Sequence, residues 1–266
     1  MKVSDRYRKL GPRLFVRWVL LMKIGKPIVR WLDRLMASQS RVGNPEIFDE
    51  PFPWVPELEA AAPKIRAELD RILQHRDELP RFVDIQPEQY KINSDHRWKT
   101  FFFSGFGVGS AHNRALCPET ARALDRIPNV ELALFSILAP GARIPRHSGV
   151  SKGLLRCHLA LKVPRDSEKV VMYVGSSQVH WAEGRAVVFD DTYKHAVVND
   201  SDEERVVLII DTPRPMRWRG RAAWALTRTL LRGSPFVRTS RRNQRRWERE
   251  AGGAFERPPA AVEALV

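Results

Sequence analysis

The chain has 266 residues, 43% of them hydrophobic, which suits one folded domain with additions and excludes a wholly disordered protein. Its two cysteines, Cys117 and Cys157, provide neither a disulfide framework nor a paired-cysteine zinc motif, as is typical of a reducing compartment. The formal net charge of +14 is uneven, because residues 1–41 carry +9 and residues 214–249 carry +11, whereas residues 42–213 carry −4.

The first predicted element is a basic helical segment over residues 1–41. Its longest uncharged apolar run, residues 18–22, is far shorter than the roughly 20 residues that span a bilayer, and no secretory cleavage site follows it. Apolar residues recur at helical spacing between Lys and Arg, which is typical of an interfacial membrane helix, here a pair of helices broken near residues 25–27. The same stripe is also compatible with packing on the domain itself. It consists of Leu14, Trp18, Leu21, Ile24, Ile28, Trp31, Leu32 and Leu35.

Residues 42–97 are predicted to form a connector and a supporting helix. The first part, residues 42–57, is rich in proline and therefore predicted to be extended. The apolar spacing that follows predicts a helix from Glu57 to about Gln74. An aromatic run at residues 98–106 predicts a strand, and a short helix is predicted to begin at Cys117-Pro118 and end at Ile127-Pro128.

Residues 98–215 are predicted to form the β-core, and residues 216–266 a basic helical extension. Short runs of β-branched and aliphatic residues alternate with Gly, Pro, Asp and Ser, which predicts a sandwich or barrel-like β-fold. Cys157, Trp54, Trp98 and Trp181 are predicted to be core residues. The predicted strands of this part are residues 130–138, 154–163, 170–174, 186–189, 196–198 and 206–211.

Polar residues lie unexpectedly on these apolar runs. Arg156 and His158 alternate with apolar neighbours and so share one face of a strand, while His195 follows an apolar run and Arg205 begins another. Charges on the inner face of a strand are unfavourable unless they are paired or bind a ligand, so the pattern predicts a polar pocket inside the β-core. In that pocket His147 and His195 can hold a divalent metal. Two histidines that are 48 residues apart are equally explained as satisfied structural residues.

At these residues the sequence resembles the aspartyl/asparaginyl β-hydroxylase family of iron- and 2-oxoglutarate-dependent dioxygenases. The likeness covers about Trp98 to Pro215 and is strongest between Phe135 and Pro213. It implies a mainly β core, a double-stranded β-helix (jelly roll, cupin-like), with flanking N- and C-terminal α-helices. The motifs that carry it are Phe135-Ser136-Ile137, Pro140-Gly141, His147-Ser148-Gly149, Arg156-Cys157-His158-Leu159, Glu183-Gly184, Phe189-Asp190-Asp191, His195 and Arg205.

The resemblance implies Fe(II) as the metal, with 2-oxoglutarate and O2 as co-substrates of a hydroxylation. It makes His147 and His195 the iron ligands. Gly149 cannot ligate, and members of the family with a glycine at this place use two protein ligands. Asp190 and Asp191 either orient His195 as outer partners of the metal site or are turn residues that end a strand.

The resemblance also places the 2-oxoglutarate. Ser136 and Arg205 would bind its distal carboxylate, and Arg156 with His158 would bind its metal-proximal end. An arginine fork suits this task, because it binds a carboxylate through two parallel hydrogen bonds, whereas lysine is a point charge.

The substrate is less well defined than the site. The likeness extends to bacterial members that hydroxylate the acyl chain of lipid A or of ornithine lipids. The basic, Trp-bearing ends independently favour a membrane substrate, since an anionic surface attracts each nearby Lys or Arg by about 1 kcal/mol. We therefore expect a cytoplasmic protein, peripheral on the inner face of the cell membrane, that does not bind nucleic acid. The motifs of this wider likeness are residues 98–102, 116–118, 127–130 and 211–215.

Two alternatives stay open. Within the enzyme class, the substrate is an Asp or Asn side chain of a peptide, or a small amino acid. In another class, the protein is a non-enzymatic binder of membrane surfaces, in which the β-core serves as a scaffold.

Overall fold

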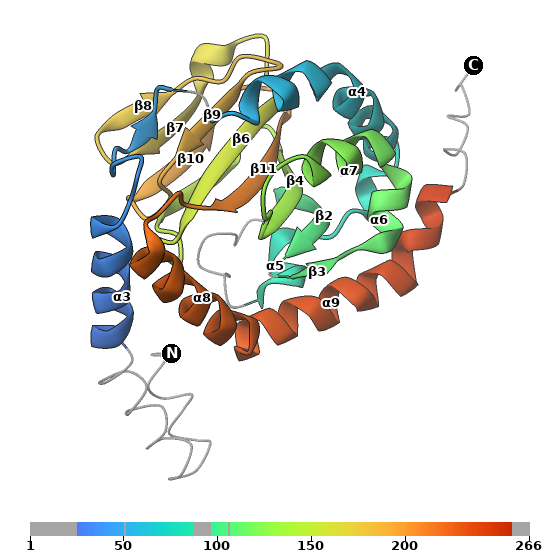
Figure 1. Cartoon of the computed structure of the whole chain (residues 1–266). Helices are drawn as coiled ribbons and strands as arrows, with labels where there is room; N and C mark the ends of the chain where they lie inside the picture. Colours follow the sequence, from blue (N-terminus) through green and yellow to red (C-terminus); the bar gives the residue numbers. More distant parts are fainter. Residues whose placement is uncertain (1–25, 51, 88–96, 106, 257–266) are drawn as a thin grey trace, which may run out of the picture.

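Eight consecutive strands form a double-stranded β-helix in the computed structural model, which describes residues 26–50, 52–87, 97–105 and 107–256 (Figure 1). The first, third, sixth and eighth strands lie in one sheet and the other four in a second sheet, with every pair antiparallel. This alternation between two sheets is the jelly-roll topology and confirms the expected fold class. The strands are β4 (Leu132–Leu138), β5 (Arg143–His147), β6 (Leu154–Lys162), β7 (Val170–Val174), β8 (Ser177–Val179), β9 (Ala186–Phe189), β10 (His195–Asn199) and β11 (Arg205–Pro213).

Three further strands extend the larger sheet at its two edges, which gives the order β1-β9-β6-β11-β4-β2-β3. The strand β1 (Ile47–Phe48) comes from the predicted connector and pairs with β9. At the opposite edge β2 (Trp98–Gly105) pairs with β4, and β3 (Val108–Gly109) pairs with β2. The smaller sheet has the order β5-β10-β7-β8.

The two faces of the larger sheet differ because successive side chains point to opposite sides of a strand. The outer face is apolar, and Phe135, Cys157 and Leu208 on it belong to one buried cluster with residues of α4 and α7. The inner face turns toward the smaller sheet and mixes apolar residues such as Leu134 and Val207 with polar ones. The helices of this half are α4 (Val55–Leu73), α5 (Phe82–Ile85), α6 (Ala111–Leu116) and α7 (Pro118–Asp125).

Helices from the two ends of the described chain pack on each other (Figure 1). The N-terminal α3 (Lys26–Ser38) lies beside α8 (Trp218–Arg232), and α9 (Pro235–Ala251) continues along the β2–β3 edge of the fold. The start of α3 matches the predicted break near residues 25–27, and the first helix of the predicted pair lies outside the described residues. No helix among the described residues is long and apolar enough to cross a membrane.

The apolar stripe of α3 is divided between two environments. Leu32 and Met36 are buried in a cluster that includes Trp224 of α8. Ile28, Val29 and Trp31 are exposed, as are Trp218, Leu226 and Leu230 on α8. Part of the stripe therefore packs on the domain, and the rest forms an apolar surface with α8.

Candidate active site

The smaller sheet brings two histidines side by side. His147 ends β5 and His195 begins β10, and the two residues are direct partners across these strands with ring centroids 4.1 Å apart. The Nδ1 atom of His147 lies 2.8 Å from the carbonyl oxygen of Pro145, and that of His195 lies 3.0 Å from the carbonyl oxygen of Tyr193. A carbonyl oxygen accepts only from an N–H, so Nδ1 carries the proton in both rings and Nε2 keeps its lone pair for a metal.

Burial keeps both rings neutral. It lowers the pKa of His195 to about 3, with further lowering from the nearby His147 and Arg156, and it also lowers the pKa of His147. A histidine must be neutral to bind a metal ion, so both side chains are in the form that can ligate a cation at neutral pH.

Arg205, the first residue of β11, is a buried cation on the inner face of the larger sheet. It is 1% exposed, and its Nε and Nη1 atoms have no hydrogen-bond partner among the described residues. Its guanidinium lies 4.8 Å from the ring centroid of Trp181, and burial lowers the pKa of Arg205 to about 9. A buried charge without a partner is unfavourable by several kcal/mol. A bound anion would therefore stabilise Arg205, and the described residues do not supply one.

His158 and Ser136 share this inner face with Arg205. His158 is buried with neither ring nitrogen hydrogen-bonded to a described residue, and burial, with help from Arg205, holds its pKa well below the usual value. The hydroxyl of Ser136 accepts a 2.9 Å hydrogen bond from Trp98 Nε1. Ser136 lies two residues from Leu138, the cross-strand partner of Arg205, and thus on the same face. Three predicted carboxylate-binding residues are therefore brought together in one buried place.

Arg156 differs from the other predicted site residues because its fork is already occupied. Its Nε and Nη2 atoms each lie 2.7 Å from an oxygen of Asp211, its cross-strand partner, and Nη2 lies 3.2 Å from Asp191. Burial alone would lower the pKa of Arg156, but Asp211 and then Asp191 outweigh it and raise the pKa. Asp211 was not among the predicted site residues, although residues 205, 207, 209 and 211 share a face of their strand.

Asp191 fills the space into which a side chain at position 149, two residues after His147, would extend. A Cβ atom on Gly149 would lie 2.1 to 2.2 Å from the carboxylate atoms of Asp191, and Gly149 N donates to the Asp191 carbonyl at 2.7 Å. Burial raises the pKa of this carboxyl to about 7. No group of three or more His, Cys, Asp or Glu residues in the described part of the chain is arranged to hold a metal.

Among the described residues, His195 is hydrogen-bonded by main-chain groups of Tyr193 and Asp191, and no side-chain hydrogen bond joins Asp190 or Asp191 to it. The partner of His195 Nδ1 is the main-chain carbonyl of Tyr193. Asp190 instead binds Arg214, Lys152 Nζ at 2.6 Å and Thr192 Oγ1 at 2.5 Å. The carboxylate of Asp190 thus joins the loop after β9 to the segments before β6 and after β11.

We expect the substitution Asp190→Asn to lower the free energy of unfolding by about 3 to 5 kcal/mol, because it leaves the fully buried Arg214 without its anion. Burial alone would raise the pKa of Asp190, but Arg214 and Lys152 outweigh it and lower the pKa. A lowered carboxyl pKa stabilises the fold above the usual pKa of about 3.9, and this contribution is lost as the pH falls through the folded value. Urea unfolding should therefore show the largest difference between wild type and variant at neutral pH. An equal difference below pH 3 would contradict this account.

A cleft opens to the outside beside His147. Its wall includes His147, Gly149, Val150, Arg156 and Asp191 on one side. The opposite side is mostly apolar and is formed by Phe82, Gln86, Trp98, Leu132, Leu134, Ile209 and Phe236. Trp98 and Trp181 are buried as predicted, whereas Trp54 is half-buried. The cleft thus offers an apolar approach to His147.

Strand order and buried site together define a jelly-roll protein with a polar centre between its two sheets. The profile of the aspartyl/asparaginyl beta-hydroxylase family matches residues 59–215. The chain therefore belongs to this family of hydroxylases.

Individual relatives agree with the family assignment. An ornithine lipid ester-linked acyl 2-hydroxylase of Rhizobium tropici is 41% identical over 225 residues, which cover 84% of this chain and 80% of that protein. The aspartate beta-hydroxylase domain-containing protein 2 of Mus musculus is 34% identical over 217 residues, 74% of this chain and 62% of that protein. Among solved structures, the cupin domain of Schizosaccharomyces pombe Cnp3 has a TM-score of 0.30 at 9% identity and covers 44% of this chain and 65% of its own, too low a score to bear on the fold.

Proposed function

We propose that this chain is an Fe(II)- and 2-oxoglutarate-dependent dioxygenase that hydroxylates the acyl chain of a membrane lipid, of lipid A or ornithine-lipid type. The observation that carries the proposal is the buried Arg205, which has no anion among the described residues and lies near His158, on which His195 also acts electrostatically. The residues fit both absent groups, since two neutral imidazoles suit a divalent metal and a buried guanidinium suits a carboxylate.

The protein would contribute binding, orientation and exclusion of water. His147 and His195 would hold Fe(II) through Nε2, and the iron with 2-oxoglutarate and O2 supplies the oxidising chemistry when bound. Arg205 would bind the distal carboxylate, with the Ser136 hydroxyl beside it. Arg205, Arg156 and His195 all act electrostatically on His158, which would bind the metal-proximal end as a neutral donor.

Arg156 would bind the same metal-proximal end while its guanidinium keeps its hydrogen bonds to Asp211. Its two hydrogen bonds to Asp211 fix its orientation at the cleft, close to both histidines. Buried aromatic residues, Trp181 and Phe189, close the inner end of the site against water.

The lipid substrate is supported by the relative from Rhizobium tropici, whose name describes an acyl 2-hydroxylase, and by the apolar side of the cleft. The test is incubation of the purified protein with Fe(II), 2-oxoglutarate and either lipid extract or a peptide rich in Asp and Asn. We expect succinate to form and a lipid to gain one oxygen. Oxygen gained by the peptide instead would favour the aspartyl/asparaginyl alternative. If no succinate forms with any substrate, the enzyme proposal fails and a membrane-binding scaffold is the better account.

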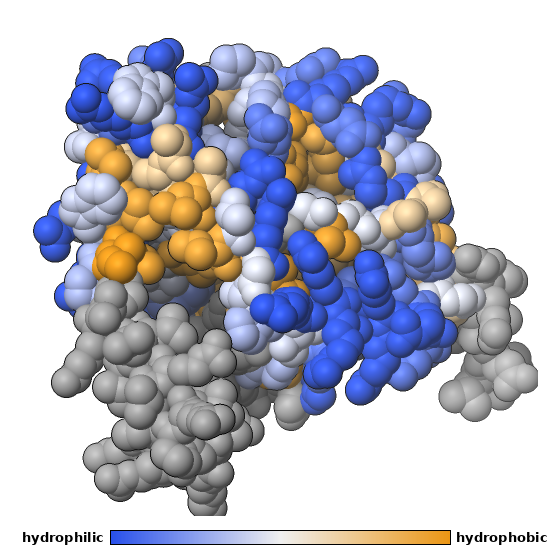
Figure 2. Space-filling view, turned by 60° about the horizontal axis from the view of Figure 1, so that its bottom comes forward, coloured by the Kyte–Doolittle hydropathy of each residue, from blue (hydrophilic) through white to orange (hydrophobic). Residues whose placement is uncertain are grey.

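We further propose that the α3–α8 surface rests on an anionic membrane, as a cytoplasmic protein on the inner face of the cell membrane would. This surface consists of Ile28, Val29, Trp31, Trp218, Leu226 and Leu230. Figure 2 shows hydrophobic residues gathered on one side of this face of the molecule, next to a strongly hydrophilic group. Trp at an apolar surface beside basic residues is typical of interfacial binding.

The double substitution Trp31→Ser and Trp218→Ser is expected to weaken binding to anionic vesicles at least tenfold. The two side chains are 59% and 66% exposed, so they contribute little to folding but much apolar area to a membrane contact. Sedimentation with phosphatidylglycerol vesicles measures the effect. Tyr173→Ser, which removes an exposed aromatic residue from β7, is the matched control and should leave binding unchanged. Equal losses in both variants would contradict the assignment of this surface.

A further inference from the structure

The loop between β5 and β6, residues 148–153, forms part of the cleft wall next to His147. Val150 of this loop lines the cleft and is 44% exposed. One anchor of the loop is the fully buried Asp190, which accepts a 2.6 Å hydrogen bond from Lys152 Nζ. A second anchor comes from the helices at the two ends of the described chain.

The helix α3 contacts this loop through Asp33. One carboxylate oxygen of Asp33, Oδ1, accepts a 3.1 Å hydrogen bond from Ser151 Oγ and a 3.0 Å hydrogen bond from the main-chain N–H of Lys152. Ser151 is buried, and its hydroxyl oxygen accepts in turn from Gly153 N at 3.2 Å. Asp33 is the one acidic residue of α3, and a negative charge on this helix weakens its attraction to an anionic surface. The contact with the loop gives this acid a role that the membrane surface does not.

The loop also packs directly on both terminal helices at Gly153. A Cβ atom at this position would lie 2.3 Å from the ring of Trp224 in α8 and 2.9 Å from Sδ of Met36 in α3. Only a residue without a side chain allows the backbone to approach so closely. Trp224 and Met36 belong to the buried cluster that joins α3 and α8, so a shift of either helix also displaces the loop.

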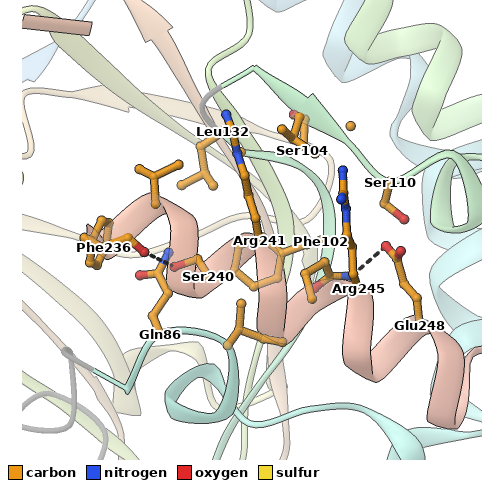
Figure 3. A pocket seen from close by; sticks show the side chains of 16 residues that line it. Gln86, Phe102, Ser104, Ser110, Leu132, Phe236, Ser240, Arg241, Arg245 and Glu248 are labelled. Carbon is orange, nitrogen blue, oxygen red and sulfur yellow. Dashed lines mark hydrogen bonds between the residues drawn. The ribbon is translucent and has the colours of Figure 1, made fainter. Parts of the chain in front are cut away.

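The opposite wall of the cleft depends on the same buried cluster. Phe236, near the start of α9, packs against this cluster and lines the cleft. Phe236 also lines a second pocket, which lies beneath α9, and Figure 3 shows it at one end of that pocket near Gln86. Val150 and Phe236 are thus both held in place by the helices whose exposed residues form the α3–α8 surface.

We infer that Asp33 is a positioning residue that couples the α3–α8 surface to the cleft. When this surface rests on a membrane, α3 is held against the domain, and Asp33 keeps residues 148–153 in the place where they shape the cleft for the acyl chain. Without its carboxylate, Ser151 Oγ and the Lys152 N–H lose their partner, and the loop opens more often. The inference rests on the proposed function and specifies how access to His147 depends on the membrane.

The test follows amide hydrogen exchange of residues 148–154 by mass spectrometry, in the full chain and without turnover. Asp33→Ala removes the acceptor, whereas Asp33→Asn keeps an acceptor oxygen, and both variants lose the same charge. We expect exchange to be about tenfold faster in Asp33→Ala than in wild type, and within about threefold of wild type in Asp33→Asn. Ser38→Ala is a further control, since it removes the hydrogen bond from Ser38 Oγ to the Leu35 carbonyl at the end of α3 and should leave the loop unchanged.

Addition of phosphatidylglycerol vesicles should slow exchange of the loop about threefold or more in wild type and Asp33→Asn, but not in Asp33→Ala, although all three sediment with the vesicles. The inference is overturned if the two Asp33 variants exchange alike, if Ser38→Ala accelerates exchange as much as Asp33→Ala, or if vesicle-bound wild type shows no slowing. Wild type that does not bind the vesicles would refute the membrane surface and the coupling to it. Succinate formation is measured separately, so an inactive protein with intact coupling counts against the proposed function alone.

Discussion

Replacement of Arg205 by methionine is expected to stabilise the fold while it abolishes 2-oxoglutarate binding. The side chain is buried without an anion, and its pKa is lowered to about 9 by burial alone. Apolar replacements of buried charges with similar volume are often stabilising by about 1 to 4 kcal/mol, and we expect a gain in this range. The same change removes about 3 kcal/mol or more of charge-assisted hydrogen bonding to a carboxylate, which is a loss of at least 100-fold in affinity.

Chemical denaturation measures the stability of this variant, and thermal unfolding with added 2-oxoglutarate measures its binding. The co-substrate should raise the melting temperature of wild type but not that of the variant, because only a bound ligand stabilises the native state. Arg165→Met is the control, since Arg165 is largely exposed and pairs with Glu203 at the surface. A variant that is less stable than wild type and still binds 2-oxoglutarate would refute the ligand role of Arg205.

His195→Ala is expected to remove metal binding and to lower hydroxylation at least 1,000-fold. With His147 and His195 as the proposed protein ligands, the loss of one leaves a single ligand, which cannot hold a labile divalent ion. Metal content after reconstitution with Fe(II) under anaerobic conditions is the direct measurement and does not depend on turnover. His180→Ala removes an exposed histidine and should change neither quantity. Equal metal content in wild type and His195→Ala would exclude the assignment.

Much of the β-core was predictable, because its strands are apolar runs bounded by turn residues. Each of the six predicted runs from residue 130 onward coincides with a strand to within two residues at its ends. The strand β5 was not predicted, since Arg143, Pro145 and Arg146 are exposed and Ile144 is its one buried apolar residue. β5 pairs with β10 at the edge of the smaller sheet, where a strand needs few apolar residues.

The site was predictable in its composition but not in its contacts. Arg156, His158, His195 and Arg205 stand out as polar residues on or next to apolar runs, whereas His147 ends a strand that is mostly polar. The pairing of Arg156 with Asp211 depends on the register of two strands that are 55 residues apart, which no local pattern specifies. The contact of Gly149 with Asp191 depends in the same way on how two loops meet.

The place of β11 in the larger sheet has a consequence for synthesis on the ribosome. It is the last strand among the described residues, yet it lies at the centre of that sheet, between β6 and β4. Until it emerges, these two strands each keep an unpaired edge, and such edges promote aggregation of nascent chains. Arg205 arrives with the same strand, so a partly synthesised chain has neither a closed sheet nor the arginine that we propose for the distal carboxylate of 2-oxoglutarate. We therefore expect chains that end before residue 205 to depend on chaperones, and the pocket to form only at the final step of folding.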